Sequence, residues 1–293
     1  ILQELVSQEG GFFSSQDSDC EGEEGKFYTW SKQEIEQILK EESDLFCALF
    51  DVTQEGNFQG KNVLHWDVSL EEFVDSMNLN QEEVEKKVEE WKKIIFAHRE
   101  KRVKPFKDPT ILTSWNALAI EALILTGAHL KEERYKEAAI KACLFLQKNV
   151  WNQGKLFHLW IEGSCKFRAL LEDYAYLIRA LLSLHEHTQQ QSFLTWAKEL
   201  SEIVEKEFKE IEGACYQTDD EQQLILRKCE FYDGQLPSGN AVHAENLLRL
   251  YEITKEEKYK KAAEDILKAA KNYIDLFPPG TCYQLLSSLR YVS

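Results

Sequence analysis

The sequence has few residues that interrupt helices, and it lacks the long apolar runs of membrane proteins. Only five prolines and thirteen glycines occur in 293 residues, while apolar residues make up 43% of the chain. This composition favours a helix-rich globular protein with a large core over a disordered chain. No apolar run approaches the roughly 18–20 residues that a transmembrane helix needs, and no secretory signal is visible at the N-terminus. We therefore expect no membrane partner.

Positive charge is also scarce. The chain carries 35 Lys and Arg against 51 Asp and Glu, a formal net charge of −16, and no Lys/Arg cluster reverses that sign locally. Because such a chain repels phosphate backbones, nucleic acid is excluded as an expected partner. The sequence also lacks a nucleophile elbow, a P-loop and a GxGxxG motif, so the common nucleotide and serine-hydrolase chemistries are not indicated.

Paired cysteines are missing as well. The seven cysteines are odd in number, widely spread and without a CxxC pair. This pattern predicts reduced thiols and a cytoplasmic location rather than a disulfide framework. Since no spacing of cysteines and histidines supports a zinc site, we expect neither a metal nor another cofactor.

An internal repeat is the strongest positive signal. Three gapless copies, anchored on Ala117, Ala175 and Ala241, share a leucine six residues on, an aromatic eighteen on and an alanine twenty-two on. Each copy predicts a helix of about 15 residues, a short polar turn and a second, antiparallel helix. Helix pairs repeated in this way must bury their faces against neighbours, in a solenoid or a closed ring. Long loops rich in aromatic and acidic residues on one side favour the ring.

Cap signals extend the helical prediction upstream. Ser31 opens a capping box for a helix to about Phe50, Ser69 caps a short helix, and Asn80 opens a long one to about Arg102. Leu2, Leu5 and Val6 resemble the last turns of a helix, so we expect an apolar edge there that self-association or an upstream segment covers. We predict an all-α fold, an α/α toroid built from helix hairpins, as a single domain over residues 1–293.

Several motifs together resemble one known family. They are Gly10–Phe13 with the acidic stretch Asp17–Tyr28, Gly56–Leu64, Leu112–Asn116, Leu171–Ala175, and Asp233-Gly234 with Pro237–Asn240. The chain is similar to the C-terminal portion of the spermatogenesis-associated protein family, whose longer members place a thioredoxin-like domain before a six-hairpin toroid. The resemblance implies a six-hairpin glycosidase-like toroid related to N-acylglucosamine 2-epimerases, and it leaves open whether this chain closes the ring. Phe106 and Thr110 stand where the family pattern usually has His and Lys, although Asp108 remains.

The candidate site residues come from the acidic loop and from the start of each first helix. Equivalent positions of hairpins in one register gather at one end of a ring, where helix N-termini offer free N–H groups to hydroxyl-rich or anionic ligands. We predict Asp173, Asp17 and Asp19 as catalytic carboxylates, since paired carboxylates serve as acid and base in glycosidases. The predicted substrate-binding residues are Trp115, Asn116, Glu172, Tyr174, Ser238, Asn240 and Asp108.

Each candidate also has a structural interpretation. Asp, Asn and Ser are the standard N-cap residues, so capping is the alternative interpretation of Ser238 and, less readily, of Asp173, which has an aromatic neighbour and an adjacent carboxylate. The acidic loop that begins at Asp17 partly matches a calcium loop, but its twelfth position is Tyr28 rather than a bidentate Glu, which leaves a capping turn or a wall of the site. His158, His65 and His243 are the histidines that an epimerase would use, and each by itself is expected to be structural.

The sequence therefore supports two functional hypotheses. The leading one is a carbohydrate-type small-molecule site, in a sugar isomerase, an epimerase or a glycoside hydrolase-like enzyme. The alternative is a non-catalytic module that binds a ligand or partner for a longer thioredoxin-like protein. Ionisable groups about 5–10 Å apart across a pocket would favour the enzyme.

Overall fold

A computed structural model describes residues 1–210, 212–221 and 224–292. The chain divides into two compact units, the hairpin unit (Ile1–Ser15 and Pro109–Ser293) and the small unit (Gln16–Asp108). Each unit has a hydrophobic core of its own. The three predicted repeats lie entirely in the hairpin unit, and a single domain over residues 1–293 stays a prediction.

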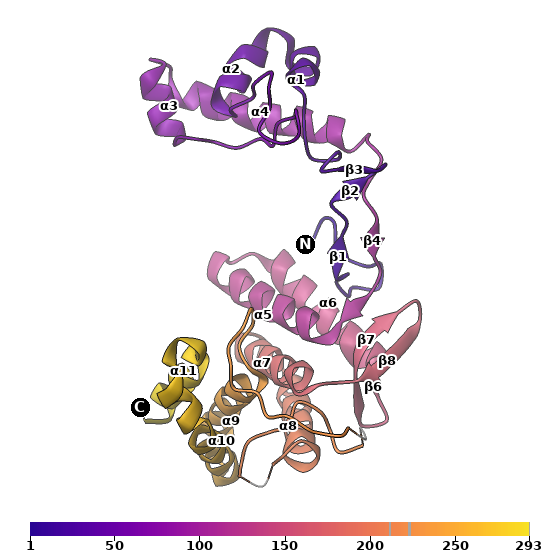
Figure 1. The fold of residues 1–293 in the computed structure, drawn as a ribbon, viewed down its shortest axis with the longest axis vertical. Coiled ribbons are helices and arrows are strands. Elements are labelled where there is room, and N and C mark those ends of the chain that lie inside the picture. The colour runs from indigo at the N-terminus through magenta and orange to yellow at the C-terminus, as the bar shows by residue number, and fades with distance from the viewer. Residues whose placement is uncertain (211, 222–223, 293) are drawn as a thin grey trace. The chain divides into compact units, whose positions relative to one another are not determined.

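The hairpin unit consists of three helix hairpins and a further helix. The hairpins are α5 (Thr113–Leu130) with α6 (Glu133–Asn149), α7 (Leu171–Thr188) with α8 (Gln191–Glu207), and α9 (Gly239–Thr254) with α10 (Glu257–Leu276), followed by η2 (Pro278–Gly280) and α11 (Cys282–Val292). The first helices pack in the order α5, α7, α9, α11, and each second helix packs on its own first helix (Figure 1). This arrangement in two layers is that of an α/α toroid, and the predicted helical fold class is confirmed.

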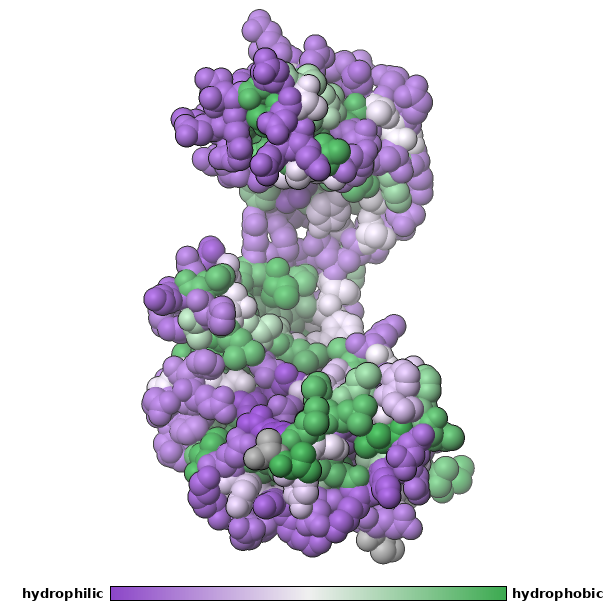
Figure 2. Space-filling view, turned by 90° about the vertical axis from the view of Figure 1, so that its left-hand side faces the viewer, coloured by the Kyte–Doolittle hydropathy of each residue, from purple (hydrophilic) through white to green (hydrophobic). Residues whose placement is uncertain are grey.

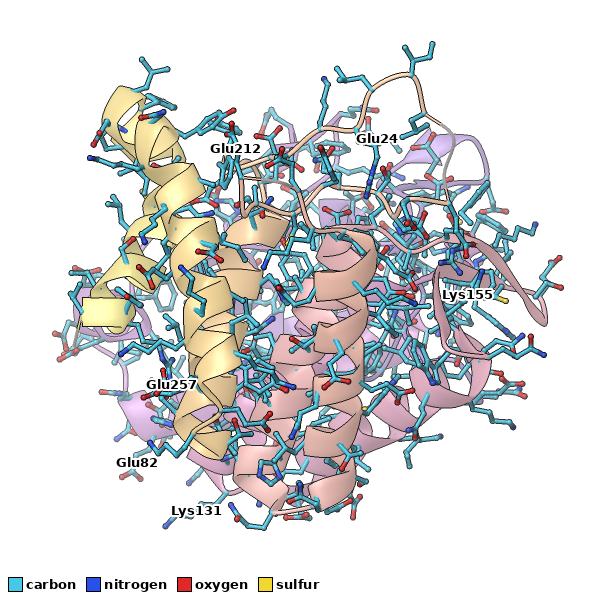
Figure 3. All side chains as sticks on the ribbon, turned by 90° about the horizontal axis from the view of Figure 1, so that it is seen from below. Glu24, Glu82, Lys131, Lys155, Glu212 and Glu257 are labelled. Carbon is cyan, nitrogen blue, oxygen red and sulfur yellow. The ribbon has the colours of Figure 1, made fainter. Side chains whose placement is uncertain are left out.

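The repeat positions explain why the hairpins pack alike. Ala117, Ala175 and Ala241 are all fully buried, so neighbouring first helices approach closely. Each first helix ends at a residue in the left-handed conformation: Lys131, Gln189 and Lys255. In Figure 3, Lys131 and Glu257 in two of these turns lie at one end of the helices, and Glu212, in the loop after α8, lies at the other.

Short strands before α5 and after α6 form a small antiparallel sheet. It comprises β5 (Ile111–Leu112), β6 (Trp151–Asn152), β7 (Lys155–Ile161) and β8 (Ser164–Arg168), and β7 pairs with the other three strands. Leu112 lies opposite Leu159, and Trp160 lies opposite Cys165. The β5–β7 ladder therefore ties the loop after α6 to the residues just before α5.

The small unit is helical, with short strands at its edge. Its elements are β2 (Asp19–Cys20), β3 (Glu23–Glu24), α1 (Lys32–Leu39), η1 (Lys40–Glu42), α2 (Ser43–Leu49), α3 (Leu70–Ser76), α4 (Gln81–Arg99) and β4 (Lys107–Asp108); β1 (Ser15–Gln16) spans the boundary of the two ranges. Ser31, Ser69 and Asn80 cap α1, α3 and α4 as predicted. The continuous helix predicted from Ser31 to Phe50 is wrong, because Lys40 adopts a positive φ of 52° and breaks it.

The N-terminal segment and α11 are the places where apolar side chains bear on the predicted self-association. The residues from Leu2 to Leu5 form turns rather than the predicted helix, and Leu2 and Val6 are half-buried against the core. On α11, by contrast, Leu286 and Leu289 are 59% and 64% exposed. Figure 2 shows hydrophobic side chains at the surface of this unit. Among the described residues no helix has the length and apolar character to cross a membrane. Self-association stays a prediction.

Candidate functional site

One residue in each repeat fastens a returning loop to the start of a first helix. The side chain of Asn116 accepts a hydrogen bond from Phe12 N at 2.7 Å and donates to Phe12 O at 2.9 Å. Asn240 bonds the N–H and the C=O of Cys215 in the same way, each at 2.8 Å. Both loop residues stand two positions after a glycine, Gly10 and Gly213, so the two loops meet their helices in the same register.

Tyr174 occupies the same position in the middle repeat. Its hydroxyl accepts from Leu156 N at 3.4 Å, and Leu156 also stands two positions after a glycine. The ring lies edge-on to Phe208 in the core, and burial raises the pKa of the hydroxyl to about 12. We call Asn116, Tyr174 and Asn240 the loop clamps. All three are at most 1% exposed, so the observed contacts are structural and their binding of a substrate stays a prediction.

Asp173 is fully buried, and both of its carboxylate oxygens are engaged. One oxygen accepts from Ser114 N at 3.0 Å; the other accepts from Leu170 N at 2.9 Å, as a cap of α7, and contacts His158 Nδ1 at 2.8 Å. The hydrogen bond to Asp173 raises the pKa of His158, although partial burial opposes the shift. Asp173 thus links the starts of α5 and α7 to β7. In this geometry it orients His158, and a direct catalytic role for it stays a prediction.

A pocket of about 490 Å³ opens at the N-terminal ends of α7 and α9. It brings together four predicted site residues, Trp115, Glu172, Ser238 and Asn240. The remaining walls come from residues next to them and from the loop between α8 and α9: Leu170, Leu171, Gln217, Thr218, Glu230, Tyr232, Gln235, Leu236, Pro237 and Gly239. Trp115 is 49% exposed and Tyr232 is 55% exposed. Two aromatic rings are therefore available to a ligand.

Glu172 is the ionisable group in this pocket with the most perturbed surroundings. Burial raises the pKa of its carboxyl, and the neighbouring charge of Asp173 raises it further. The carboxyl makes no hydrogen bond or ion pair to any residue within the described ranges. Glu172 is therefore a carboxylic acid that keeps its proton to higher pH than usual and has its hydrogen-bonding capacity free.

Glu230 is a second pocket carboxylate, and the sequence did not single it out. Its Oε1 accepts from Phe231 N at 3.1 Å and from Tyr232 N at 3.0 Å, which fixes the carboxylate at the pocket wall. Thr218, also in the wall, has a buried hydroxyl with no hydrogen-bond partner among the described residues. Glu230 stands in a loop without periodicity, so no spacing in the sequence singled it out.

Ser238 performs the capping role that its residue type suggested. Its hydroxyl accepts from Ala241 N at 3.2 Å, and its own N–H donates to Asp233 Oδ1 at 2.9 Å. Asp233 also accepts from Tyr283 N at 2.7 Å, which ties the start of α9 to α11. Ser238 is 5% exposed and lines the pocket, so its predicted contact with a ligand stays open.

The acidic candidates Asp17, Asp19 and Asp108 lie in the small unit. Asp17 Oδ1 accepts from Asp19 N at 3.1 Å, the bond of a local acidic turn, and Asp19 then begins the β2–β3 hairpin. Asp108 ends β4 and is half-buried. Because each unit is described by itself, a site that these residues share with the hairpin unit stays a prediction.

The chain has sequence relatives along most of its length. Spermatogenesis-associated protein 20 of Homo sapiens is 30% identical over 293 residues, which cover 87% of this chain and 37% of that protein. An uncharacterized protein of Caenorhabditis elegans is 28% identical over 94% of this chain and 42% of its own length. The chain thus spans less than half of these relatives.

Parts of the chain are also similar to parts of solved structures. Cellobiose 2-epimerase from Bacillus thermoamylovorans matches with a TM-score of 0.47 and 20% identity, over 55% of this chain and 44% of that chain. A GH76 α-mannanase of Bacteroides thetaiotaomicron matches with a TM-score of 0.48 and 15% identity, over 59% and 46%. No protein-family model matches the chain.

Proposed function

This chain is a homologue of spermatogenesis-associated protein 20, and we propose that its pocket at the starts of α7 and α9 binds a carbohydrate-type ligand. In the proposed chemistry Glu172 donates a proton to a sugar oxygen, and Glu230 acts as the anchored carboxylate. The single observation that carries the proposal is the free, half-buried carboxyl of Glu172 in a 490 Å³ pocket beside the exposed ring of Trp115.

The pocket has the chemical character that a sugar requires. Its volume falls in the range of about 300–1,000 Å³ that is usual for small-molecule sites. Trp115 and Tyr232 offer flat apolar surfaces for a sugar face, while Glu172, Gln217, Thr218 and Glu230 offer hydrogen bonds to hydroxyl groups. The negative charge of the chain disfavours an anionic ligand, so a neutral sugar fits best.

The two pocket carboxylates have different surroundings, which suits one of them to act as an acid. Burial, and then the charge of Asp173, raise the pKa of the Glu172 carboxyl, so it holds its proton to higher pH than an exposed glutamate does. Glu230 accepts hydrogen bonds from two backbone N–H groups, which hold its carboxylate in place at the pocket wall. Pairs of carboxylates in unlike surroundings are the arrangement that glycoside cleavage uses, with one group protonating the leaving oxygen and the other activating water or attacking carbon. This favours a hydrolase-like reaction over an epimerase, which uses paired histidines.

Binding is tested with a pair of matched tryptophan variants. A panel of neutral mono- and disaccharides is screened by saturation-transfer NMR against the wild type, Trp115→Ala and Trp66→Ala. Trp66 is 41% exposed, close to the 49% of Trp115, but it lies in the small unit. We expect binding of at least one sugar that Trp115→Ala weakens about tenfold, since stacking contributes on the order of 1 kcal/mol, while Trp66→Ala binds as the wild type does. Equal loss in both variants, or no binding by the wild type, would contradict the proposal.

Turnover is tested separately with Glu172→Gln. If the pocket is catalytic, this variant retains sugar binding and loses turnover by about 100-fold or more, the range typical of a removed general acid. If the wild type binds a sugar without converting it, the chain is the non-catalytic binding module instead. Glu162→Gln, a change in the turn between β7 and β8, serves as the charge-matched control.

A further inference from the structure

We propose that Glu205, Cys215 and His243 form a zinc-binding site in the hairpin unit, separate from the sugar pocket. The three side chains offer one carboxylate oxygen, one thiol sulfur and one imidazole nitrogen, all within 4.8 Å of one another. Thiolate, imidazole and carboxylate are the ligands that Zn²⁺ takes in proteins. We name these residues the Glu-Cys-His cluster.

The cluster is assembled by tertiary structure from three separate segments. Glu205 comes from the last turns of α8, Cys215 from the loop that follows, and His243 from the second turn of α9. The loop clamp Asn240 holds both backbone groups of Cys215 and stands three residues before His243 on the same helix. Two ligands are therefore held in place by one rigid element, which is the condition for a preformed metal site.

The geometry of the carboxylate and the imidazole suits a shared ion. His243 Nε2 lies 3.3 Å from Glu205 Oε1. Two ligands that each bind one tetrahedral zinc ion at about 2.0–2.1 Å are themselves separated by about 3.3 Å. The other carboxylate oxygen of Glu205 accepts from Lys209 Nζ at 2.9 Å, as a supporting group of a metal ligand does. A zinc ion between the ligands thus needs little rearrangement of these two side chains.

Burial makes the cluster unusual for an ordinary ion pair. His243 and Cys215 are both fully buried. The second nitrogen of His243, Nδ1, has no hydrogen-bond partner within the described parts of the chain.

The cluster also has an opening on one side. Glu205 lines a second pocket of about 450 Å³ between α8 and α10, whose walls include Ser201, Lys209 and Tyr259. The hydroxyl oxygens of Ser201 and Tyr259 are buried and make no hydrogen bond to any residue that the structure describes. Three protein ligands would leave one position of a four-coordinate zinc ion for water, and this pocket would supply that water at the Glu205 side of the cluster. On binding, the Cys215 thiol forms the Zn–S bond and releases its proton to solvent.

Cobalt substitution provides the test on the full chain. The reduced protein is stripped with a chelator and titrated with Co²⁺, which reports thiolate coordination by a charge-transfer band in the near ultraviolet. We expect one equivalent of Co²⁺ to produce the band, and one equivalent of Zn²⁺ to abolish it. Cys215→Ala should remove the band, while Cys282→Ala, which changes an exposed free thiol, should leave it intact. Glu205→Gln should keep the band and weaken binding about tenfold or more.

The outcomes distinguish a site from adventitious binding. A wild type with no charge-transfer band overturns the proposal, whether or not any variant folds. A band that survives in Cys215→Ala, or that disappears in Cys282→Ala, assigns the metal to another thiol and overturns it as well. The melting temperature of the wild type should also rise with the concentration of free Zn²⁺, because an ion that binds only the folded state stabilises it.

Discussion

Replacing Asp173 with Asn removes a charge and one acceptor at the point where three segments meet. The carboxylate accepts from Ser114 N and Leu170 N and contacts His158 Nδ1, and the residue is fully buried. An Asn oxygen can replace only one of the two acceptors, so the new NH₂ group must face a backbone N–H. The imidazole of His158 can adapt to the NH₂ group by changing its tautomer, whereas the backbone N–H groups of Ser114 and Leu170 are always donors. A buried donor left unsatisfied costs about 1–3 kcal/mol, and the lost charge-assisted bond adds about 1–2 kcal/mol. We therefore expect Asp173→Asn to lower the free energy of unfolding by about 3 kcal/mol.

The size of this loss should depend on pH in a defined direction. The Asp173 hydrogen bond raises the pKa of His158 above its ordinary value of 6.5. A raised histidine pKa contributes stability that is fully present below pH 6.5 and is lost as the pH rises through the folded-state pKa. Asp173→Asn removes this contribution. The difference between wild type and variant should therefore be larger at about pH 5.5 than at about pH 8.5.

Urea unfolding followed by far-ultraviolet circular dichroism at the two pH values measures both effects. Glu172→Gln is the neighbouring control, since the Glu172 carboxyl makes no hydrogen bond within the described chain, and we expect a change within about 0.5 kcal/mol. A loss below about 1 kcal/mol for Asp173→Asn at both pH values, together with lost turnover, would refute the positioning role and favour direct catalysis.

Two further predictions concern packing. Asn116→Ala and Asn240→Ala should each lower the free energy of unfolding by about 3–4 kcal/mol, because each side chain makes three hydrogen bonds to backbone groups, two of them buried and one partly buried. Asn246→Ala, which loses one buried bond, should lose about 1–2 kcal/mol in urea unfolding. Equal losses in all three variants would contradict the clamp assignment. Gly56→Ala should make the small unit much more susceptible to limited proteolysis, because at a φ of +72° the new Cβ would overlap the carbonyl oxygen of Lys61. Gly60→Ala is the matched control: its φ is +79°, but its Cβ would meet open space, so we expect a loss of only about 1 kcal/mol from backbone strain. Similar cleavage rates for the two alanine variants would show that the contact with Lys61 is relieved cheaply.

The sequence predicted the parts of the fold that depend on local pattern. The spacing of Ala117, Ala175 and Ala241 predicted the hairpins, their turns and the end of the unit to which the loops return, because helical periodicity and short turns leave little choice. The sequence-based prediction was wrong at Lys40, where a positive φ interrupts an otherwise continuous helical pattern. It was also wrong at Leu2–Val6, where apolar spacing alone suggested a helix. Neither position carries a Gly or Pro that would have signalled the break.

The candidate sites were predicted only in part, because their members converge from separate segments. Trp115, Glu172, Ser238 and Asn240 share a pocket because equivalent positions of a repeat share one end of the unit. Glu230 and Tyr232 belong to the long loop between α8 and α9, which has no period to read. The Glu-Cys-His cluster was missed for the same reason. Its residues have no motif spacing, and tertiary contacts such as that between Asn240 and Cys215 bring the thiol near His243.

Comparing equivalent positions of the three repeats distinguishes residues with a structural role from candidates for function. The residue just before each anchor alanine bonds the returning loop in every copy, although it is Asn, Tyr and Asn in turn. A position that makes the same loop contact in each copy has a structural role, so a polar residue there is weak support for ligand binding. The position two residues earlier is Ser114, Glu172 and Ser238, and its surroundings differ: Ser114 donates its N–H to Asp173, Ser238 caps α9, and Glu172 has a free carboxyl in the pocket. Glu172 is therefore the member of this position that the fold does not use, which makes its replacement the sharpest test of function.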